Sequence, residues 1–479
     1  MRTGGRAAYA SNVTTDAVGL RRARAAPSYR TAVDGRRTGL LTDHYELTMV
    51  QAALRSGAAH RRAVFEVFAR QLPPGRRYGV VAGSARLTHA LQRFRFDAAD
   101  VRFLRSAGIV DDATAEYLAG YRFTGNIWGY GEGDCYFPGS PILVVESTFA
   151  QAVLLETLTL SILNHDCAIA SAASRMVHAA AGRPIIEMGG RRTHELAAVA
   201  AARAAYIAGF ACTSNLRAGR DYGIPTAGTS AHAFTLVHDD ERQAFSVQLD
   251  ALGPGTTLLV DTFDVEAAVR TGVELAGPGL GAVRIDSGDL PVVAGQVRAL
   301  LDSLGATSTR IVISSDLDEY SIAALAAAPG DAYGVGTSLV TGSGAPTAGL
   351  VYKLVARTAA AGRAAGRAPL RPVAKRSAGK PTRGGRKWAA RRLDVDGRAV
   401  AEVVSDVPLP RAAGGRPLLR ELVRDGEVLP DEPLAVARER HRAAIAELPA
   451  SALALTPGEP VIPTLFEPAA HPGSQPALI

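Results

Sequence analysis

Short apolar runs and amphipathic helices alternate along the second half of the chain. The segment LPVVAGQVRALLDSLG is a typical helix between two such runs. This alternation predicts eight βα units, the pattern of a (β/α)8 barrel or an irregular version of it. A doubly wound sheet is the structural alternative, but the pattern offers no switch point for it. The predicted strands are 184–188, 210–214, 225–229, 257–263, 282–287, 310–315, 332–337 and 370–375.

The first part of the chain has a different rhythm. Between residues 38 and 147, DHYELTMVQAALRSG has a helical pattern, whereas AVFEVFA, FTGNIWGY and PILVVES have strand patterns. After residue 388, RRLDVDGRAVAEVV and LLRELVRDGEVL predict hairpins with Asp-Gly turns, and PLAVARERHRAAIAEL predicts a helix. We expect these late elements to fold back on the first segment.

These patterns predict an α/β protein made of two folded parts. Residues 149–387 would form the irregular barrel, and residues 38–148 with 388–455 would form an α+β domain built from N- and C-terminal segments. Residues 1–37 are Arg/Ser/Ala-rich and are predicted to be a disordered extension; an organelle transit peptide is the alternative. Residues 456–479 form a Pro-rich tail, either disordered or ordered on docking.

Composition narrows the class of protein only a little. Of the 479 residues 47% are hydrophobic, which is ample for a core, and the net charge of +7 permits an anionic partner without selecting one. Three cysteines without a CxxC pair argue against a disulfide framework or a structural zinc site, and suit a reducing cytoplasm. We expect no apolar run in the sequence to reach the length of a membrane span. We therefore expect a cytoplasmic protein that does not cross a membrane.

Lysine is rare and confined to one region. Only four of the 53 basic residues are lysines, namely Lys353, Lys375, Lys380 and Lys387. Arginine presents a planar fork, whereas lysine presents a compact and flexible ammonium. The stretch KRSAGKPTRGGRK therefore indicates a need for point charges.

Polar and small residues follow the predicted strands directly, in the motifs GGRRTHE, SNLRAG, SAH, DTFD, DSGD, SSDLDE, GVGTS and KRSAGK. In a barrel all of these points lie on the rim where βα loops build active sites. Neither a GxxxxGK[ST] loop nor a GxGxxG turn with an acid at the right distance is present. The sequence therefore predicts chemistry on the rim without either of these nucleotide-binding loops.

Two rim motifs fit a phosphorylated sugar. In AVRIDSGDL, Arg284, Asp286 and Ser287 could hold a sugar diol, although a capped helix start is the alternative. In GVGTS, backbone N–H groups could surround a phosphate, near the usual phosphate site of such barrels. His232 follows the third run, where a packed or surface histidine is the alternative to a functional one.

The chain resembles the nicotinate phosphoribosyltransferase family over roughly residues 42–387. The motifs that carry the resemblance are TDHYELTM, EMGGRRTHE, GTSNLRAG, GTSAHAF, DTFD, VRIDSGDL, SSDLDEY, GVGT with VYKLV, and KRSAGKPTRGGRK. The resemblance implies a barrel of the type II phosphoribosyltransferase kind. It implies synthesis of nicotinate mononucleotide and diphosphate from nicotinate and phosphoribosyl pyrophosphate (PRPP) with ATP and Mg²⁺, the first step of NAD salvage from nicotinate.

The resemblance also implies roles for particular residues. Arg191 would meet the diphosphate or the nicotinate carboxylate, Arg284 and Asp286 would hold the ribose and its phosphates, and Asp261 would stabilise the oxocarbenium-like centre. Tyr45 would stack on the pyridine ring, reaching the site of the neighbouring subunit in a homodimer.

Further roles follow from the other motifs. Gly336 and Thr337 would seat the 5′-phosphate, and His232 would be phosphorylated transiently from ATP. The loop that carries Lys380 would close over ATP or PRPP phosphates. The Mg²⁺ ligands are left unassigned.

Two departures from the family pattern and one specificity position modify this interpretation. Met188 stands where many relatives have an aromatic residue, so one face of the pyridine ring would meet a thioether. Asp316 receives no role, because SSDLDE varies from the form expected in the family. Enzymes of the same fold that use nicotinamide place Asp where this chain has Ser214, which favours nicotinate.

Two alternatives remain open beside nicotinate phosphoribosyltransferase. One is a nicotinamide phosphoribosyltransferase of the same fold, and the other is a non-catalytic barrel that binds polyanions. The scattered arginines and the low aromatic content of 6% argue against nucleic acid as a partner.

Overall fold

The computed structural model describes residues 37–359, 368–376, 382–409, 415–467 and 477–478. The chain divides into two compact units, which we call the barrel unit (residues 179–206 and 210–338) and the sheet unit (described residues of 37–178, 207–209 and 339–478). Residues 149–178 and the described residues of 339–387 belong to the sheet unit, so this division differs from the predicted boundaries at 149 and 387. The predicted extension 1–37 lies almost wholly outside the described residues.

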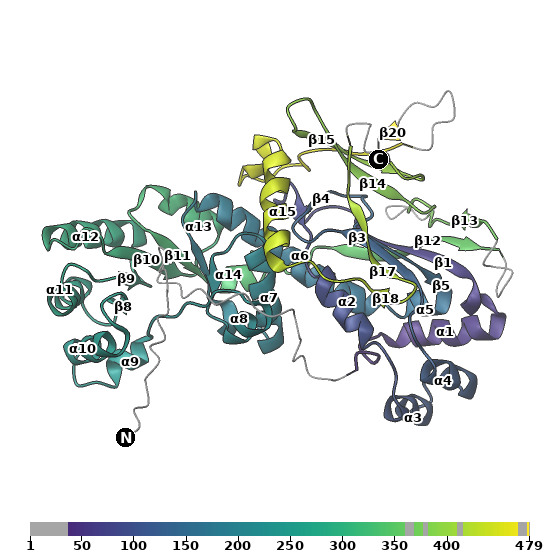
Figure 1. Ribbon diagram of the computed structural model, residues 1–479, viewed down its shortest axis with the longest axis horizontal. Helices are drawn as coiled ribbons and strands as arrows, with labels where there is room; N and C mark the ends of the chain where they lie inside the picture. Colours follow the sequence, from purple (N-terminus) through teal and green to yellow (C-terminus); the bar gives the residue numbers. More distant parts are fainter. Residues whose placement is uncertain (1–36, 360–367, 377–381, 410–414, 468–476, 479) are drawn as a thin grey trace, which may run out of the picture. The chain divides into compact units, whose positions relative to one another are not determined.

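The barrel unit is built on a parallel six-stranded sheet (Figure 1). Its strand order is β7-β6-β11-β10-β9-β8, and every pair in it is parallel. A single parallel bridge between Thr213 and Thr226 extends the sheet beyond β7. The strands are β6 Ile185–Glu187, β7 Cys212–Thr213, β8 Thr257–Leu259, β9 Ala282–Ile285, β10 Arg310–Ser315 and β11 Ala332–Val335.

The first and last of these strands in chain order, β6 and β11, are neighbours, as in a closed barrel. The sheet curls into a half barrel, since no pairing joins the segment at Thr226 to β8. Seven of the eight predicted runs therefore lie where a barrel needs them. The eighth prediction, 370–375, is wrong: β13, Leu370–Pro372, pairs antiparallel with β12 in the sheet unit. The pattern of hydrophobic and polar residues alone does not distinguish this short polar strand from a strand of the barrel.

Helices follow most strands of the barrel unit, and Figure 1 shows α10, α11 and α12 along the side of β8, β9 and β10. Five of them begin with an Asn or Asp side chain that accepts a hydrogen bond from the first turn: Asn215, Asp240, Asp264, Asp289 and Asp318. The helical segments are η2 Gly189–Arg191, α7 Glu195–Ile207, α8 Leu216–Tyr222, α9 His232–Leu236, α10 Glu241–Leu252, α11 Val265–Ala276, α12 Leu290–Ser303, α13 Glu319–Ala324, η3 Leu325–Ala327 and α14 Thr337–Val340.

The sheet unit contains an antiparallel seven-stranded sheet of order β13-β12-β1-β5-β3-β17-β18. As predicted, the late hairpin strand β17 pairs with β3 of the first segment. The strands of this sheet are β1 Arg62–Ala69, β3 Asn126–Tyr130, β5 Leu143–Thr148, β12 Leu350–Thr358, β13 Leu370–Pro372, β17 Leu419–Arg424 and β18 Glu427–Val428.

A second sheet of the unit has the order β16-β14-β15-β19-β20, and β2 pairs with β4. Strand β19 lies inside the predicted Pro-rich tail, so part of that tail is built into a sheet. The strands are β2 Gly79–Val80, β4 Cys135–Tyr136, β14 Trp388–Leu393, β15 Ala399–Ser405, β16 Gly415–Pro417, β19 Thr464–Phe466 and β20 Ala477–Leu478.

Helices cover the large sheet and share one apolar core with it. The stretch Phe149–Ala179 is long and apolar enough to cross a membrane by length and composition, which corrects the expectation from sequence. However, 67% of that window is buried inside the protein, as in any long core helix. The helical segments are α1 His44–Ser56, η1 Ala58–His60, α2 Ser84–Gln92, α3 Ala98–Ser106, α4 Asp112–Ala119, α5 Phe149–Val153, α6 Glu156–Ala179, α15 Leu434–Glu447 and η6 Ala450–Leu453.

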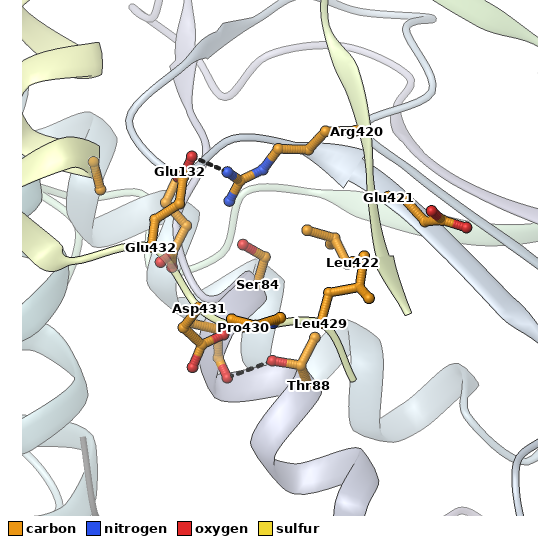
Figure 2. A pocket seen from close by; sticks show the side chains of 12 residues that line it. Ser84, Thr88, Glu132, Arg420, Glu421, Leu422, Leu429, Pro430, Asp431 and Glu432 are labelled. Atoms are coloured by element: carbon orange, nitrogen blue, oxygen red, sulfur yellow. Dashed lines mark hydrogen bonds and ion pairs between the residues drawn. The ribbon is translucent and has the colours of Figure 1, made fainter. Parts of the chain in front are cut away.

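A small polar cleft of about 50 Å³ opens beside α2 in the sheet unit. Figure 2 shows Glu132, Glu432 and Arg420 converging on one side of it. Arg420 forms an ion pair with Glu432, which Arg440 also approaches to 2.6 Å. Glu132 accepts a hydrogen bond of 2.6 Å from the N–H of Gly83, at the start of α2. Glu432 thus pairs with two arginines at this cleft, while Arg420 Nε is buried without a hydrogen-bond partner.

Two of the four lysines have structural partners that the sequence did not reveal. Lys387 is 3% exposed, and its Nζ lies 2.6 Å from the Glu66 carboxylate on β1. Lys353 pairs with Glu156 at 3.2 Å, whereas Lys375 is exposed and Lys380 lies outside the described residues. Lys387 therefore does not fit the predicted role of meeting phosphates, because its ammonium is buried in an ion pair.

This ion pair predicts a large effect on stability. Lys387→Met should lower the free energy of unfolding by about 3–5 kcal/mol, because it leaves Glu66 buried without its ion-pair partner. The double variant Glu66→Leu/Lys387→Met should recover most of the loss, since neither charge is then buried alone. Chemical unfolding measures both effects, with exposed Lys375→Met as the matched control. A single variant as stable as that control would contradict the assignment.

Candidate active site

The register of the parallel strands brings the ends of several strands together on one face. Ser314 pairs with Gly334, and Val312 pairs with Arg284. Paired residues in neighbouring strands point to the same face, and successive residues alternate. Arg284, Ser314 and Gly334 therefore share the face of a small apolar cluster composed of Ile186, Cys212, Ala282, Val312 and Ala332. This cluster fills the inner side of the curled sheet below the rim.

Arg284 and Asp286 form the centre of a hydrogen-bonded network on that rim. The guanidinium lies 3.1 Å from Asp286 Oδ1, donates to Ser314 Oγ at 2.8 Å, and donates to Thr229 Oγ1 at 3.0 Å. The Ser314 hydroxyl donates in turn to Asp286 Oδ1 at 2.6 Å. Burial alone would raise the pKa of Asp286, but the Ser314 hydrogen bond and the Arg284 charge outweigh it and hold the pKa below its usual range. Asp286 is therefore a carboxylate at neutral pH.

Asp261 links this network to His232. One oxygen, Oδ2, accepts from the N–H of Asp286 at 3.0 Å and from the Ser287 hydroxyl at 2.7 Å. The other oxygen, Oδ1, is buried, has no hydrogen-bond partner, and lies 3.9 Å from His232 Nε2. The side chain of Asp261 is only 3% exposed, whereas that of His232 is 43% exposed. The histidine is thus accessible and faces a buried carboxylate.

Glu241 at the start of α10 adds a further acid near Asp261. Burial is the main cause that raises its pKa to about 7, and the charges of Asp264 and Asp261 add to it. One of its oxygens, Oε1, is buried without a hydrogen-bond partner. Sequence analysis did not single out this residue, because nothing in DDERQAF departs from an ordinary helix start.

Two cavities open on the rim and share three residues, Met188, Arg191 and Arg284. The smaller has a volume of about 230 Å³, and its lining includes Asp286, Ser314, Asp316, Gly336 and Thr337. The larger has a volume of about 550 Å³, and its lining includes Ser214, Asn215, Leu216, Gly228, Thr229 and Ser230. Six predicted residues therefore line one cavity or both: Arg191, Ser214, Arg284, Asp286, Gly336 and Thr337.

Close packing explains one of the glycines in this lining. A Cβ atom on Gly334 would lie 2.8 Å from the Met188 sulfur and 3.0 Å from Ser314 Cβ. Any side chain there would displace Met188 and the serine that holds Arg284. Gly336, two residues further, begins the turn into α14, where the Thr337 hydroxyl donates to Asp316 Oδ1 at 3.3 Å.

Two predicted residues, Tyr45 and Lys380, are not among those that line the cavities in the described part of the chain. Tyr45 lies on α1 of the sheet unit and is 45% exposed. Burial raises the pKa of its hydroxyl to about 12, with the nearby charges of Glu156, Glu46 and Asp43 adding to the effect. Lys380 lies outside the described residues.

Sequence reasoning missed several residues of the rim. Ser314 was passed over in SSDLDE, although a hydroxyl at the end of an apolar strand was a usable signal. Glu187 and Thr213 support the loops that carry Arg191 and Ser214. In the part of the chain that the structure describes, no group of three or more His, Cys, Asp or Glu side chains could hold a metal ion.

Solved structures define the class of fold. The crystal structure of human nicotinic acid phosphoribosyltransferase matches with a TM-score of 0.75 at 26% identity, covering 89% of this chain and 97% of that one. Nicotinate-nucleotide pyrophosphorylase from Pyrococcus furiosus matches with a TM-score of 0.69 at 24% identity, covering 89% and 98%. The half barrel and its companion unit thus have the type II phosphoribosyltransferase fold.

Sequence comparison identifies the family. The family model of the nicotinate phosphoribosyltransferase N-terminal domain matches residues 40–164. A nicotinate phosphoribosyltransferase of Mycobacterium tuberculosis is 58% identical over 441 residues, covering 90% of this chain and 96% of the relative. One from Bacillus subtilis is 38% identical over 326 residues, covering 66% of each. The chain belongs to the nicotinate phosphoribosyltransferase family and is a phosphoribosyltransferase enzyme.

The Ser314 hydroxyl predicts a measurable effect on the reaction. Ser314→Ala removes a donor to Asp286 and an acceptor for Arg284, so kcat/KM should fall about tenfold. The pKa of Asp286 should rise once the donor is lost, so the acid limb of the pH–rate profile should move to higher pH. Steady-state kinetics across pH tests this, with Ser303→Ala on α12 as the control. An unmoved acid limb with wild-type kcat/KM would rule out the role of Ser314.

Proposed function

We propose that this enzyme transfers the phosphoribosyl group of PRPP to nicotinate, forming nicotinate mononucleotide and diphosphate as the first step of NAD salvage from nicotinate. ATP hydrolysis drives the synthesis through transient phosphorylation of His232. The family to which the chain belongs supports the reaction class, and the geometry of the rim supports the assignment of subsites.

One observation carries the proposal: two adjoining cavities share the cations Arg191 and Arg284. The larger cavity, with Ser214 and Arg191, suits a small aromatic acid whose carboxylate needs a hydroxyl donor and a cation. The smaller cavity, with Asp286 and the Gly336–Thr337 turn, suits a ribose phosphate. The shared arginines lie where the two substrates would meet.

The chemistry explains why carboxylates and cations stand side by side. The bond between ribose C1 and the diphosphate oxygen breaks, and a bond from the pyridine nitrogen to C1 forms. Positive charge develops on the sugar while negative charge develops on the leaving diphosphate. Asp286 and Asp261 would stabilise the positive charge on the sugar. Arg191 and Arg284 would stabilise the negative charge on the diphosphate, so that carboxylates and arginines alike bind the transition state more tightly than the ground state.

The carboxylates of the rim fit a role for Mg²⁺ as a partner of the diphosphate. Asp286 uses Oδ1 for Arg284 and Ser314, and exposed Asp316 also lines the smaller cavity. Mg²⁺ is commonly held by one or two carboxylates together with substrate phosphates, which agrees with the lack of a three-ligand cluster among the described residues. Asp286 and Asp316 would hold the ion, which neutralises charge on the leaving group when bound.

Tyr45 and Lys380 complete the proposal. The exposure of Tyr45 on α1 supports a contact made outside its own unit, and we assign it to the pyridine of a neighbouring subunit in a homodimer. Lys380 is assigned to the phosphates of ATP or PRPP.

The substrate choice gives a direct prediction. Ser214 is exposed at the cavity and can donate to a carboxylate, whereas no aspartate stands at its position to accept from an amide. We expect nicotinate to be used with a kcat/KM at least about a hundredfold above that of nicotinamide, since an unpaired polar group in such a site is strongly disfavoured. Product formation is measured with each base and PRPP, with and without ATP.

The same panel separates the competing functions. Preference for nicotinamide would indicate the alternative enzyme of this fold. No turnover of either base would contradict the proposed function. Omission of PRPP is the negative control.

The surroundings of His232 support a nucleophilic role. Its Nδ1 lies 3.1 Å from the Thr262 hydroxyl, which donates onward to Thr235 at 3.4 Å. With Thr262 accepting from Nδ1–H, the lone pair of a neutral imidazole would be on Nε2. That nitrogen could attack the γ-phosphorus of ATP, releasing ADP, and the phosphoryl group would pass to water as the nucleotide forms.

His232→Asn should therefore abolish ATP hydrolysis and the stimulation by ATP while leaving slow PRPP-dependent synthesis. Labelling with γ-labelled ATP should place acid-labile, base-stable phosphate on the peptide that contains His232. His238→Asn, just after the same helix, is the matched control and should behave as wild type. Label on another peptide, or stimulation by ATP that survives in His232→Asn, would overturn the assignment.

A further inference from the structure

Glu187 is a buried carboxylate with no cation beside it. It ends β6, is 1% exposed, and lies between Ile186 and Met188, two residues that contact the inner cluster. Because side chains alternate along a strand, Glu187 points to the opposite face and does not line either cavity. Among the described residues no Lys, Arg or His lies within ion-pair distance of it. Burial raises its pKa, against the opposing effect of its hydrogen bonds.

Both oxygens of Glu187 bind the loops that follow β6 and β7. Oε1 accepts from the N–H of Gly189 at 2.5 Å, and Oε2 accepts from the Thr213 hydroxyl. The backbone carbonyl of the same residue accepts from the N–H of Ser214 at 2.8 Å. One residue therefore contacts both loops through three acceptors.

The first loop carries Arg191. Gly189 is the first residue of the 3₁₀ turn that ends at Arg191, and its carbonyl accepts from the N–H of Arg192 at 2.8 Å. A hydrogen bond to the first N–H of so short a turn sets where the turn begins. The position of the exposed Arg191 side chain at the cavity therefore depends on the Glu187 carboxylate.

The second loop carries Ser214. The Thr213 oxygen accepts from the N–H of Asn215 at 2.9 Å while its hydroxyl donates to Glu187. Asn215 in turn caps α8 by accepting from the N–H of Ala218 at 3.0 Å. The hydrogen bonds thus run without a break from Glu187 through Thr213 to the start of α8, with Ser214 between them.

A structural role alone does not account for an acid at this position. A buried carboxylate without a cation is unfavourable, and an apolar or amide side chain would cost less to bury. Only a carboxylate offers two acceptors at once, one for an N–H and one for a hydroxyl. The acid is thus suited to joining two loops rather than to stabilising one strand.

We propose that Glu187 is a positioning residue of the nicotinate subsite, holding the Gly189–Arg191 turn and the Thr213–Asn215 loop at a fixed separation. The inference rests on the proposed assignment of Arg191 and Ser214 to nicotinate. It adds a residue that touches neither substrate and acts through the two loops.

Kinetics of Glu187→Ala, Glu187→Gln and Thr213→Val test the inference. Glu187→Ala should raise the KM for nicotinate about tenfold or more while the KM for PRPP changes less than about twofold. Glu187→Gln should recover only part of the loss, since its amide oxygen still accepts from Gly189 whereas its amide N–H₂ cannot accept from the Thr213 hydroxyl. Thr213→Val, which keeps the shape and removes the hydroxyl, should raise the same KM about fivefold.

The double variant Glu187→Ala/Thr213→Val adds a test of coupling. Its KM for nicotinate should rise by clearly less than the product of the two single effects, because both variants break one shared hydrogen bond. Thermal unfolding is measured in parallel. If Glu187→Ala does not fold, Thr213→Val and Glu187→Gln decide the question through the same two KM values. Glu66→Gln, at a buried acid of the sheet unit, is the control for loss of a buried carboxylate.

Three results would overturn the inference. One is an unchanged KM for nicotinate in Glu187→Ala or Thr213→Val, and another is an equal rise in the KM of both substrates without rescue by Gln. The third is a wild-type enzyme that does not use nicotinate, which removes the proposed function and this inference together. Nicotinate turnover by the wild type is therefore measured first, so that failure of the function is distinguished from failure of the positioning role.

Discussion

Parallel pairing of the six strands is the constraint on which the rest of the barrel unit depends. Parallel neighbours must carry their carboxyl ends at the same edge, so six loops start from one rim. Residues far apart in the chain then meet with defined register, as Ser314 does with Gly334 and Val312 with Arg284. The rim therefore holds the Arg284 guanidinium and the Asp286 and Asp261 carboxylates in one hydrogen-bonded network.

Arg284 and Asp286 on this rim are each held by contacts from more than one element. Arg284 contacts Asp286 just after its own strand, Ser314 on β10 and Thr229 on the loop that follows the Thr226 bridge. Such fixed groups need little reorganisation when charge develops in a reaction, which is the main source of electrostatic catalysis. Asp261 keeps one oxygen free of hydrogen bonds next to His232. Asp261 Oδ1 therefore lies unpaired beside the accessible imidazole of His232.

The sheet unit uses its charges differently. Lys387 and Glu66 are buried together, and the preceding residue, Arg386, lies 3.5 Å from the centre of the Trp388 ring and 2.9 Å from Glu146. These contacts anchor the end of the KRSAGKPTRGGRK stretch on strands β1 and β5. The concentration of lysines in that region therefore has at least one structural cause, since a compact ammonium fits the buried site between the Glu66 carboxylate and the Gly385 carbonyl.

The sequence by itself determined the family, seven of the eight barrel runs, and most residues of the rim. Motifs such as EMGGRRTHE and VRIDSGDL are contiguous, and a strand followed by a polar turn leaves its mark in neighbouring residues. Only the tertiary structure decided that the eighth run belongs to another sheet, because its partner β12 is met through antiparallel pairing. It also decided that Glu187, Thr213 and Ser314 support the site. The hydrogen bonds that join Glu187 to Thr213, and Ser314 to Asp286 and Arg284, span 26 to 30 positions and form only after the strands have paired, so the sequence could not reveal these contacts.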